Sequence, residues 1–367
     1  MVEWKRLGDI CKVHTGKQLN KSDMLESGSY PVMNGGRDYS GFTDKYNEQS
    51  NSITISQGGE SAGFVNWINV DFWAGAHCFV VEESKTLNKR YLYHTLKNKE
   101  RDLRISKQGA GIPGLNRDSL YKQVIPVPSD SEQQRIVGIL DTFTSSIDNL
   151  KRQIKQRRKQ YEYYRESLMN VDEGPEARLI TLGEIGTFER GNGIQKKDFT
   201  EEGVGCIHYG QIHTYYGLST TETISYISKE QAKKCKKAQY GDIIIATTSE
   251  DVEGCAKAVA WLGNHEICIS GDSLVFHHNE NPKYIAYLFQ MNYFQKFKRG
   301  RCTGAKVTRI SSKALSDYPF VLPIRSRQAE IVSNLDTFEE SIYNLEEQLK
   351  LREKQYEYYR NKLLTFE

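Results

Sequence analysis

The sequence IVGILDTFTSSIDNLKRQIKQRRKQYEYYR occupies residues 136–165, and IVSNLDTFEESIYNLEEQLKLREKQYEYYR occupies residues 331–360. With a constant offset of 195, twenty of the thirty aligned positions are identical. An internal repeat of this kind dictates the architecture of a chain. It predicts two similar halves, each a globular segment followed by one long helix. Such a duplicated protein is expected to contact a target that has two parts.

The repeated helices carry an apolar seam. Apolar residues recur at spacings of four and three along 136–168 and 331–363, with one polar break in each copy, at Arg157 and at Arg352. One such helix would expose its stripe to water, whereas two helices can bury both stripes against each other. We therefore expect an intramolecular coiled coil. The alternative is that each helix packs only on its own globular segment.

Charges beside the seam predict the orientation of the pair. One heptad position is basic on the first helix and acidic on the second, and an antiparallel pair brings these positions together. Each exposed pair is worth only a few tenths of a kcal/mol, but together they favour one orientation. The residues are Lys151, Arg158 and Arg165, facing Glu339, Glu346 and Glu353. About 33 residues make a rod of roughly 50 Å. We expect a globular segment at each end, about one turn of duplex DNA apart.

The globular segments share a weaker pattern. LGDI and LGEI open them, and strand-like runs, a helical stretch, a basic stretch and prolines follow in the same order. We expect an α+β fold with two pseudo-symmetric β-rich recognition domains separated by a two-helix antiparallel coiled coil. The expected strands are 52–56, 63–70, 242–247 and 256–262, and the expected helical stretches are 89–103 and 282–297. The expected segments are 1–128, 129–170, 171–323 and 324–367.

Composition narrows the class of protein. The chain has 367 residues, 38% of them apolar and 26% charged, which suits globular domains. No apolar run approaches a membrane span or a signal peptide, and none of the seven cysteines forms a C-x-x-C pair. We expect free thiols, a cytoplasmic location and no metal site. The net charge is only +3, so nucleic-acid binding would need local basic patches or partner subunits.

The order of these elements resembles the specificity subunits of type I restriction–modification enzymes. The resemblance covers essentially the whole chain, and its specific feature is the repeated order of the motifs. They are KQYEYYR at 159–165 and 354–360, LGDI at 7–10, LGEI at 182–185, YPVMNGG at 30–36 and IHYGQI at 207–212. The resemblance implies a non-catalytic subunit whose two target-recognition domains each read one half of a bipartite site in double-stranded DNA.

The same resemblance implies partners and a cofactor outside this chain. Two methyltransferase subunits would dock on the coiled coil and use S-adenosylmethionine, and restriction subunits with translocase and endonuclease activity would join them. This chain would bind no cofactor itself. Two other functions stay open at this point, an N6-adenine DNA methyltransferase and a bivalent adaptor that binds two protein segments.

Three short motifs suggest catalysis but lack its structural context. GESAG at 59–63 fits a nucleophile elbow, yet a strand-like run follows it, so we expect a hairpin turn. GAGIPG at 109–114 follows a basic helix rather than a strand, which disfavours dinucleotide binding. NPKY at 281–284 suggests an amino-methyltransferase motif, but it is better explained as a helix start with Pro282 in the first turn. We therefore expect no catalytic residue.

Candidate DNA-binding residues are basic, amide and other polar or aromatic residues in the divergent loops. Arg and Lys can bond guanine, Asn and Gln can bond adenine, and cations next to glycines can meet phosphates. Solvated loop residues are the alternative for each of them. In the first half the candidates are Lys17, Asn34, Arg37, Tyr39, Gln57, Arg104 and Lys107. In the second half they are Gln195, Lys196, Lys197, Tyr209, Gln211, His213, Thr248, Ser249, Arg299 and Lys306.

Overall fold

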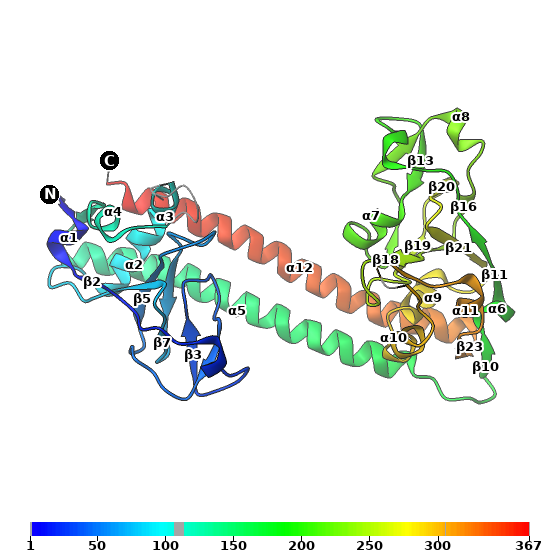
Figure 1. Cartoon of the computed structure of the whole chain (residues 1–367), viewed down its shortest axis with the longest axis horizontal. Helices are drawn as coiled ribbons and strands as arrows, with labels where there is room; N and C mark the ends of the chain where they lie inside the picture. Colours follow the sequence, from blue (N-terminus) through cyan, green and yellow to red (C-terminus); the bar gives the residue numbers. More distant parts are fainter. Residues whose placement is uncertain (1, 106–113, 305, 367) are drawn as a thin grey trace. The chain divides into compact units, whose positions relative to one another are not determined.

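A computed structural model describes residues 2–105, 114–304 and 306–366. The chain forms two compact units. Figure 1 shows their elements, coloured along the sequence from blue to red. The first contains Met1–Gln153 and Leu345–Glu367, and the second contains Ile154–Asn344. Each long helix is thus divided between the two units. The four segments expected from sequence stay a prediction, because these units group the chain differently.

The first unit is built on two small sheets. One has the strand order β2-β8-β5-β6 and the other β4-β3-β7. All five residues of β5, SITIS, are buried. β-Branched residues such as its Ile and Thr are common in interior strands of this kind. A separate pair, β1 with β9, joins the start of the unit to the segment before the long helix. The strands are β1 Glu3–Arg6, β2 Val13–Thr15, β3 Tyr30–Met33, β4 Gly41–Thr43, β5 Ser52–Ser56, β6 Val65–Ile68, β7 Trp73–Ala74, β8 Cys78–Val81 and β9 Val124–Val127.

Short helices cover these sheets. They are α1 Leu7–Ile10, η1 Lys21–Asp23, α2 Lys89–Asn98, α3 Glu100–Ile105 and α4 Arg117–Tyr121. The Asn88 side chain caps α2 by accepting the backbone N–H groups of Arg90 and Tyr91. The helical stretch expected at 89–103 is interrupted at Lys99. Beside this break the Glu100 carboxylate accepts the backbone N–H of Val65 at 3.0 Å.

The second unit repeats this plan with larger sheets. Their strand orders are β11-β21-β17-β19-β14 and β12-β15-β13-β20-β16, with two further pairs, β10 with β23 and β18 with β22. The central strand β17, IIIA, is fully buried. The strands are β10 Ala177–Thr181, β11 Gly186–Arg190, β12 Phe199–Thr200, β13 Val204–Ile207, β14 Ser219–Thr220, β15 Ser225–Ile227, β16 Lys237–Ala238, β17 Ile243–Ala246, β18 Thr248–Ser249, β19 Ala258–Trp261, β20 Ile267–Ile269, β21 Ser273–His278, β22 Thr308–Arg309 and β23 Pro319–Pro323.

The short helices of the second unit repeat the order of the first, with α7 and α8 added among the described residues. They are α6 Leu182–Ile185, η2 Lys196–Asp198, α7 Tyr209–Thr214, α8 Lys229–Ala232, α9 Pro282–Leu288, α10 Asn292–Arg299 and α11 Ser312–Ser316. The Asn281 side chain caps α9, and Pro282 stands in its first turn, as expected for NPKY. The stretch expected at 282–297 is two helices, since the chain leaves the helix at Phe289 and α10 begins only at Asn292.

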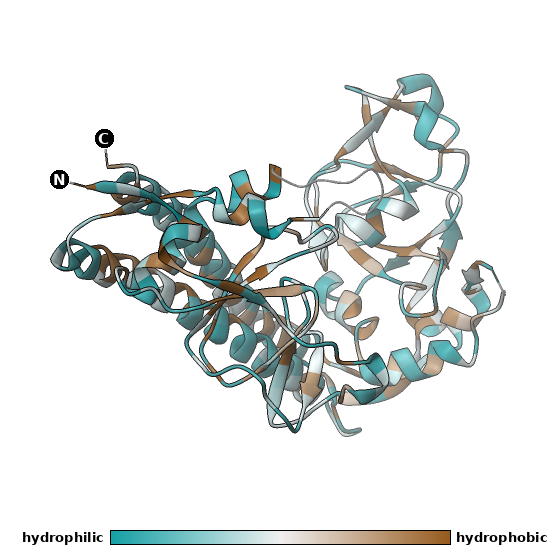
Figure 2. Ribbon diagram, turned by 60° about the vertical axis from the view of Figure 1, so that its left-hand side comes forward, coloured by the Kyte–Doolittle hydropathy of each residue, from teal (hydrophilic) through white to brown (hydrophobic). Residues whose placement is uncertain are grey.

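The long helices are α5 Asp130–Met169 and α12 Arg325–Leu364, and they run antiparallel in each unit. In the first unit Phe143, early in α5, stacks on Tyr359, late in α12, with ring centroids 5.3 Å apart. In the second unit Tyr164, late in α5, stacks on Phe338, early in α12, at 5.1 Å. Hydrophobic and hydrophilic residues alternate along both helices (Figure 2). The expected antiparallel pairing is confirmed.

The charged pairs beside the seam are only partly as expected. Lys151 Nζ lies 3.1 Å from Glu353 Oε1. Antiparallel pairing of these positions would also bring Arg165 opposite Glu339, but each of them has another partner. Arg165 donates to Gln290 on the segment after α9 at 3.2 Å, and Glu339 accepts the Tyr161 hydroxyl at 2.8 Å. A hydrogen bond to a carboxylate inside the partly buried seam thus replaces an exposed ion pair.

An equivalent glutamine ties each long helix to its unit. Gln133 of α5 accepts the Asn88 N–H at 2.7 Å, and Gln328 of α12 accepts the Asn281 N–H at 3.0 Å. Each amide also donates to a proline carbonyl just before its helix, at 3.1 and 2.8 Å. Both glutamines are buried. Within the described ranges, no helix has both the length and the apolar content required to cross a membrane.

Candidate nucleic-acid interface

The same backbone hydrogen bonds shape the candidate surface in both units. The Gly16 N–H donates to the Cys78 carbonyl, and the Gly191 N–H donates to the Ser273 carbonyl, each at 3.0 Å. A Cβ on either glycine would lie only 2.2–2.3 Å from a backbone carbonyl oxygen. Only glycine permits so close an approach. The glycines at the start of the divergent loops therefore hold one scaffold that occurs twice.

A second shared feature is a parallel strand pair, and a polar residue follows it in each unit. Asn34 follows β3, which pairs with β7, and His208 follows β13, which pairs with β20. The residue after β7 donates its N–H to the last carbonyl of β3 at 2.9 Å, and the residue after β20 donates to the last carbonyl of β13 at 3.2 Å. Asn34 and His208 thus occupy equivalent positions.

Three candidates of the first unit gather around the segment 74–77. Lys17 and Gln57 donate their backbone N–H groups to carbonyls of this segment, at 2.8 and 3.0 Å. The Asn34 side chain lies against Gly75, where a Cβ would come within 2.1 Å of its Oδ1. Oδ1 is buried and has no hydrogen-bond partner in the part of the chain that the structure describes.

Two arginine candidates lie at the turn between β5 and β6. The Arg37 guanidinium lies 5.5 Å from the centre of the Phe64 ring, and the Arg104 backbone packs against Gly63. Both arginines are exposed. The GESAG motif forms this antiparallel hairpin turn, as expected, rather than a strand-to-helix elbow. Exposed guanidinium groups at a hairpin can reach a phosphate backbone.

The last candidates of the first half are separate from these groups. Tyr39 lies in the turn between β3 and β4, and burial raises the pKa of its hydroxyl, although 44% of the residue is exposed. Lys107 lies outside the described residues, as do 109–113 of the glycine-rich run.

Candidates of the second unit converge on one groove. A cavity of about 720 Å³ lies between η2, α7, β18 and the loop 250–254. A neighbouring cavity of about 330 Å³ is lined by Gln195, Tyr209 and the glycines at 191 and 271. Sequence analysis had selected six of the residues that line the larger cavity. They are Lys196, Tyr209, Gln211, His213, Thr248 and Ser249.

Hydrogen bonds inside the groove limit what two of these side chains can do. Gln211 accepts the His208 backbone N–H at 2.9 Å and donates to Ser225 Oγ at 2.6 Å, so both ends of its amide are engaged. His213 Nε2 lies 2.9 Å from the Thr248 carbonyl, which can only accept. The proton therefore resides on Nε2 and is engaged by this carbonyl. Of the two ring nitrogens, Nδ1 is the one left to contact a ligand.

His208 lines both cavities although sequence analysis did not select it. It is 9% exposed, and its Nδ1 accepts the Gly210 N–H at 3.2 Å. Burial, and then the nearby Lys196 ammonium, lower the pKa of this imidazole, which favours the neutral ring. A neutral ring that accepts at Nδ1 carries its proton on Nε2. That N–H has no protein partner among the described residues.

Charged residues that sequence analysis missed complete the groove. Glu250 and Asp251 contribute carboxylates, and Lys257 donates to the His213 carbonyl at 3.2 Å. Burial lowers the pKa of Lys257. No spacing in the sequence distinguishes these residues. For His208 one signal was available, since it precedes a Tyr-Gly pair at the place where Asn34 precedes a Gly-Gly pair.

The remaining candidates lie on the rim or beyond it. Lys197 is exposed beside Lys196, and Lys306 is exposed in the bend before Val307, which lines the groove. Arg299 pairs with the exposed Glu253 carboxylate at 3.2 Å. These residues stay predictions as DNA contacts.

A buried lysine next to Arg299 supports the groove loop. Lys298 is only 1% exposed, and its Nζ donates to the carbonyls of Glu253 and Cys255, both at 2.7 Å. These carbonyls lie at the end of the loop 250–254 and directly after it. Among the described residues, no three or more His, Cys, Asp or Glu side chains are placed to hold a metal ion.

The chain is similar to known proteins along most of its length. The family model described as "Type I restriction modification DNA specificity domain" matches residues 1–158 and 176–352. A putative type I restriction enzyme specificity subunit of Haemophilus influenzae is 28% identical, over 100% of this chain and 96% of that protein. The EcoR124I/EcoR124II specificity subunit of Escherichia coli is 26% identical, over 100% and 94%.

Solved structures share the fold. The S subunit of a type I restriction-modification system from M. genitalium has a TM-score of 0.62 at 19% identity and covers 100% of this chain and 97% of that one. A chain from a study of complex assembly in the type I R-M system has a TM-score of 0.60 at 16% identity and covers 99% and 97%. The family model matches both recognition segments together with most of each long helix, and the chain therefore belongs to the type I restriction–modification DNA specificity family.

Proposed function

We propose that this chain is the DNA-reading subunit of a type I restriction–modification complex and performs no chemistry itself. Each unit would read one half of a bipartite site in double-stranded DNA. The observation that carries the proposal is one backbone scaffold that occurs twice with different side chains at equivalent places. Asn34 stands in the first unit where His208 stands in the second. Such a pair of domains suits a target whose two halves differ in sequence.

Local cations rather than net charge would supply the affinity for the DNA backbone. Lys17, Arg37, Lys196 and Lys197 are exposed near the proposed reading surfaces. Each phosphate that such a cation neutralises should add about 0.9 to the slope of log affinity against log salt. A bivalent protein adaptor would show little dependence on salt. This difference separates the two functions in one titration.

We also propose that methyltransferase subunits dock on the paired helices. The KQYEYYR segments present the same exposed surface in both units, where Tyr163 is 68% and Tyr358 is 59% exposed. A surface that occurs twice suits two copies of one partner. In this proposal S-adenosylmethionine binds to that partner, and restriction subunits join the complex for cleavage. The helices would fix the spacing of the half-sites.

The experiment combines the full chain with its methyltransferase subunits and DNA that carries the two-part site. Insertion of one or two base pairs between the half-sites should abolish methylation, while base changes inside the spacer should not. Unchanged methylation with altered spacing would contradict the role of the helices as a spacer. As a control for catalysis, S-adenosylmethionine is titrated into the purified chain alone. Binding there would favour the adenine methyltransferase instead.

A further inference from the structure

We infer that the residue after the parallel strand pair, Asn34 in the first unit and His208 in the second, is a base-reading position of each half-site. The inference rests on the proposed function and goes beyond it by naming the specificity-determining side chains. It stands on two separate observations. One is the equivalent position of the two residues, and the other is a polar atom without a protein partner on each of them.

The His208 imidazole is fixed before any ligand arrives. It caps α7 by accepting the Gly210 N–H at Nδ1, and Gln211 holds the His208 backbone N–H in return. The rings of Phe199 and Tyr209 lie beside it, with centroids 6.1 and 4.6 Å away. Because Nδ1 is occupied as an acceptor, Nε2 presents a hydrogen-bond donor. The ring lines both cavities of the second unit, so this donor can meet an acceptor there.

Asn34 presents the corresponding unpaired group in the first unit. Its Oδ1 is buried without a hydrogen-bond partner in the described part of the chain. A buried polar atom of this kind is costly to the fold unless a partner arrives from outside. Oδ1 lies against Gly75, where a Cβ would come within 2.1 Å of it, so the amide must rotate away from this glycine to meet a base.

The chemistry of these groups fits base edges. In the major groove, the purine N7, guanine O6 and thymine O4 atoms are acceptors that a histidine N–H can meet. An asparagine amide offers a donor and an acceptor, which matches the N6 and N7 atoms of adenine. Both residues directly follow a paired strand, and their side chains are short and have few rotatable bonds. Lys17 in the first unit and Lys196 in the second are exposed nearby and are better suited to phosphates.

The test uses substitutions that separate the two nitrogens of His208. In His208→Asn, Oδ1 can replace Nδ1 as the cap of α7, but the Nε2 donor is lost. In His208→Gln, an amide donor remains near the Nε2 position, while the cap is lost. Asn34→Ser probes the equivalent position without involving α7. The full chain is expressed with its methyltransferase subunits, and methylated sites across the genome are sequenced.

We expect His208→Asn to relax or switch one base position in one half of the methylated sequence, with discrimination reduced about tenfold. The other half should stay unchanged, which serves as an internal control for folding. His208→Gln should retain more of the discrimination. Asn34→Ser should alter only the opposite half. These results together would support a base-reading role at both positions.

Three outcomes would overturn the inference. The first is a methylated sequence unchanged in both halves. The second is a uniform loss at all sites with no change of sequence, which indicates phosphate contacts. The third is altered discrimination in both halves for each variant, which indicates a structural role. Failure of the proposed function is recognised separately, because the wild-type chain would then direct no methylation to any two-part site.

Discussion

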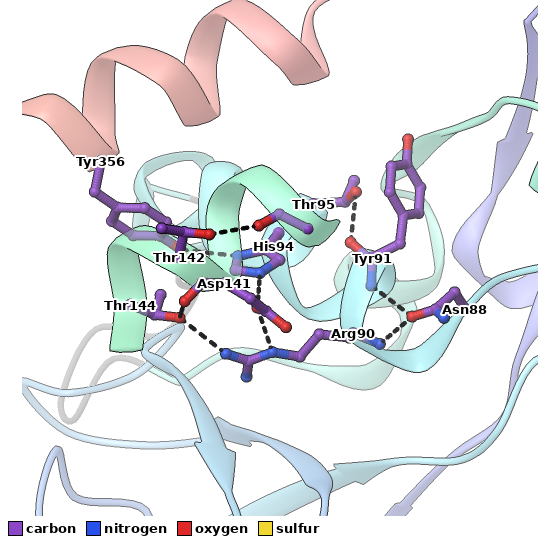
Figure 3. A network of polar contacts seen from close by, with 10 residues as sticks. Asn88, Arg90, Tyr91, His94, Thr95, Asp141, Thr142, Thr144 and Tyr356 are labelled. Carbon is purple, nitrogen blue, oxygen red and sulfur yellow. Dashed lines mark hydrogen bonds and ion pairs between the residues drawn. The ribbon is translucent and has the colours of Figure 1, made fainter. Parts of the chain in front are cut away.

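The Tyr356 hydroxyl lies 3.0 Å from Nδ1 of His94, although 262 residues separate them in the sequence. Figure 3 shows His94 between Tyr356 and Asp141, whose carboxylate lies 2.7 Å from Nε2. Arg90 donates to the same carboxylate oxygen at 2.7 Å. Burial alone would raise the pKa of Asp141, but the hydrogen bond from His94 and the charge of Arg90 lower it. This network joins α2, α5 and α12 inside the first unit.

Tyr356→Phe tests that junction. The substitution keeps the ring but removes the donor to a buried imidazole nitrogen, so we expect a loss of about 1–2 kcal/mol in the free energy of unfolding. Tyr359→Phe is the matched control, because Tyr359 is 40% exposed and its stacking on Phe143 needs no hydroxyl. It should change stability by less than about 0.5 kcal/mol. Denaturant titration of both variants measures the difference. Equal losses would refute the assigned hydrogen bond.

Sequence reasoning predicted the architecture because a repeat with a heptad seam constrains both copies at once. Antiparallel pairing followed from complementary charges in successive heptads, and one of those pairs, Lys151 with Glu353, is present. Arg165 has a different partner, because a residue of the globular unit, Gln290, competes for the arginine. A helix pattern carries no information about such tertiary partners.

The candidate site was predictable only as a region. Glycines and polar loop residues identified the groove of the second unit, since six of its residues had been selected. Their individual roles depend on hydrogen bonds between distant segments. Gln211 has the side chain of an adenine reader, yet Ser225 and the His208 backbone occupy its amide. The weak sequence signal of His208 gained meaning when the strand pairing gave it the position that Asn34 has in the first unit.

Stability of the second unit should fall in mild acid because of His278. Burial, with the charges of His277 and Arg325, lowers the pKa of this imidazole from 6.5 to about 4. A depressed histidine pKa means that the fold favours the neutral ring. Its contribution is therefore complete above pH 6.5 and is lost as the pH falls towards 4. The loss at pH 5 should be roughly 1–2 kcal/mol.

The control for this pH dependence is His278→Asn. The Nδ1 atom of His278 accepts the Glu280 N–H at 3.0 Å, and an asparagine Oδ1 can do the same without titrating. Unfolding midpoints of the two proteins, compared at about pH 7 and pH 5, should diverge in acid. Parallel curves over this range would show that His278 does not titrate as proposed.

Lys298→Met should disorder the loop that lines the groove. The lysine stem is buried, and methionine can fill a similar volume, but the carbonyls of Glu253 and Cys255 would lose their donor. Leaving one buried and one part-buried acceptor unpaired should cost about 1–3 kcal/mol. The neighbouring Arg299→Met alters an exposed side chain and should cost far less. Limited proteolysis should cut 250–254 faster in the first variant only.

Two glycine substitutions should act in opposite directions. Gly138 lies inside α5 and is exposed, and no atom lies within 4 Å of the position that a Cβ would occupy, so Gly138→Ala should raise stability by about 0.5–1 kcal/mol. Gly191→Ala would place a Cβ 2.2 Å from the Ser270 carbonyl oxygen. The strand end must then shift, and we expect a loss of at least about 2 kcal/mol together with weaker DNA discrimination in one half-site. Thermal unfolding measures the first effect, and genome-wide methylation measures the second. A stable Gly191→Ala chain with unchanged specificity would show that this close approach does not shape the reading surface.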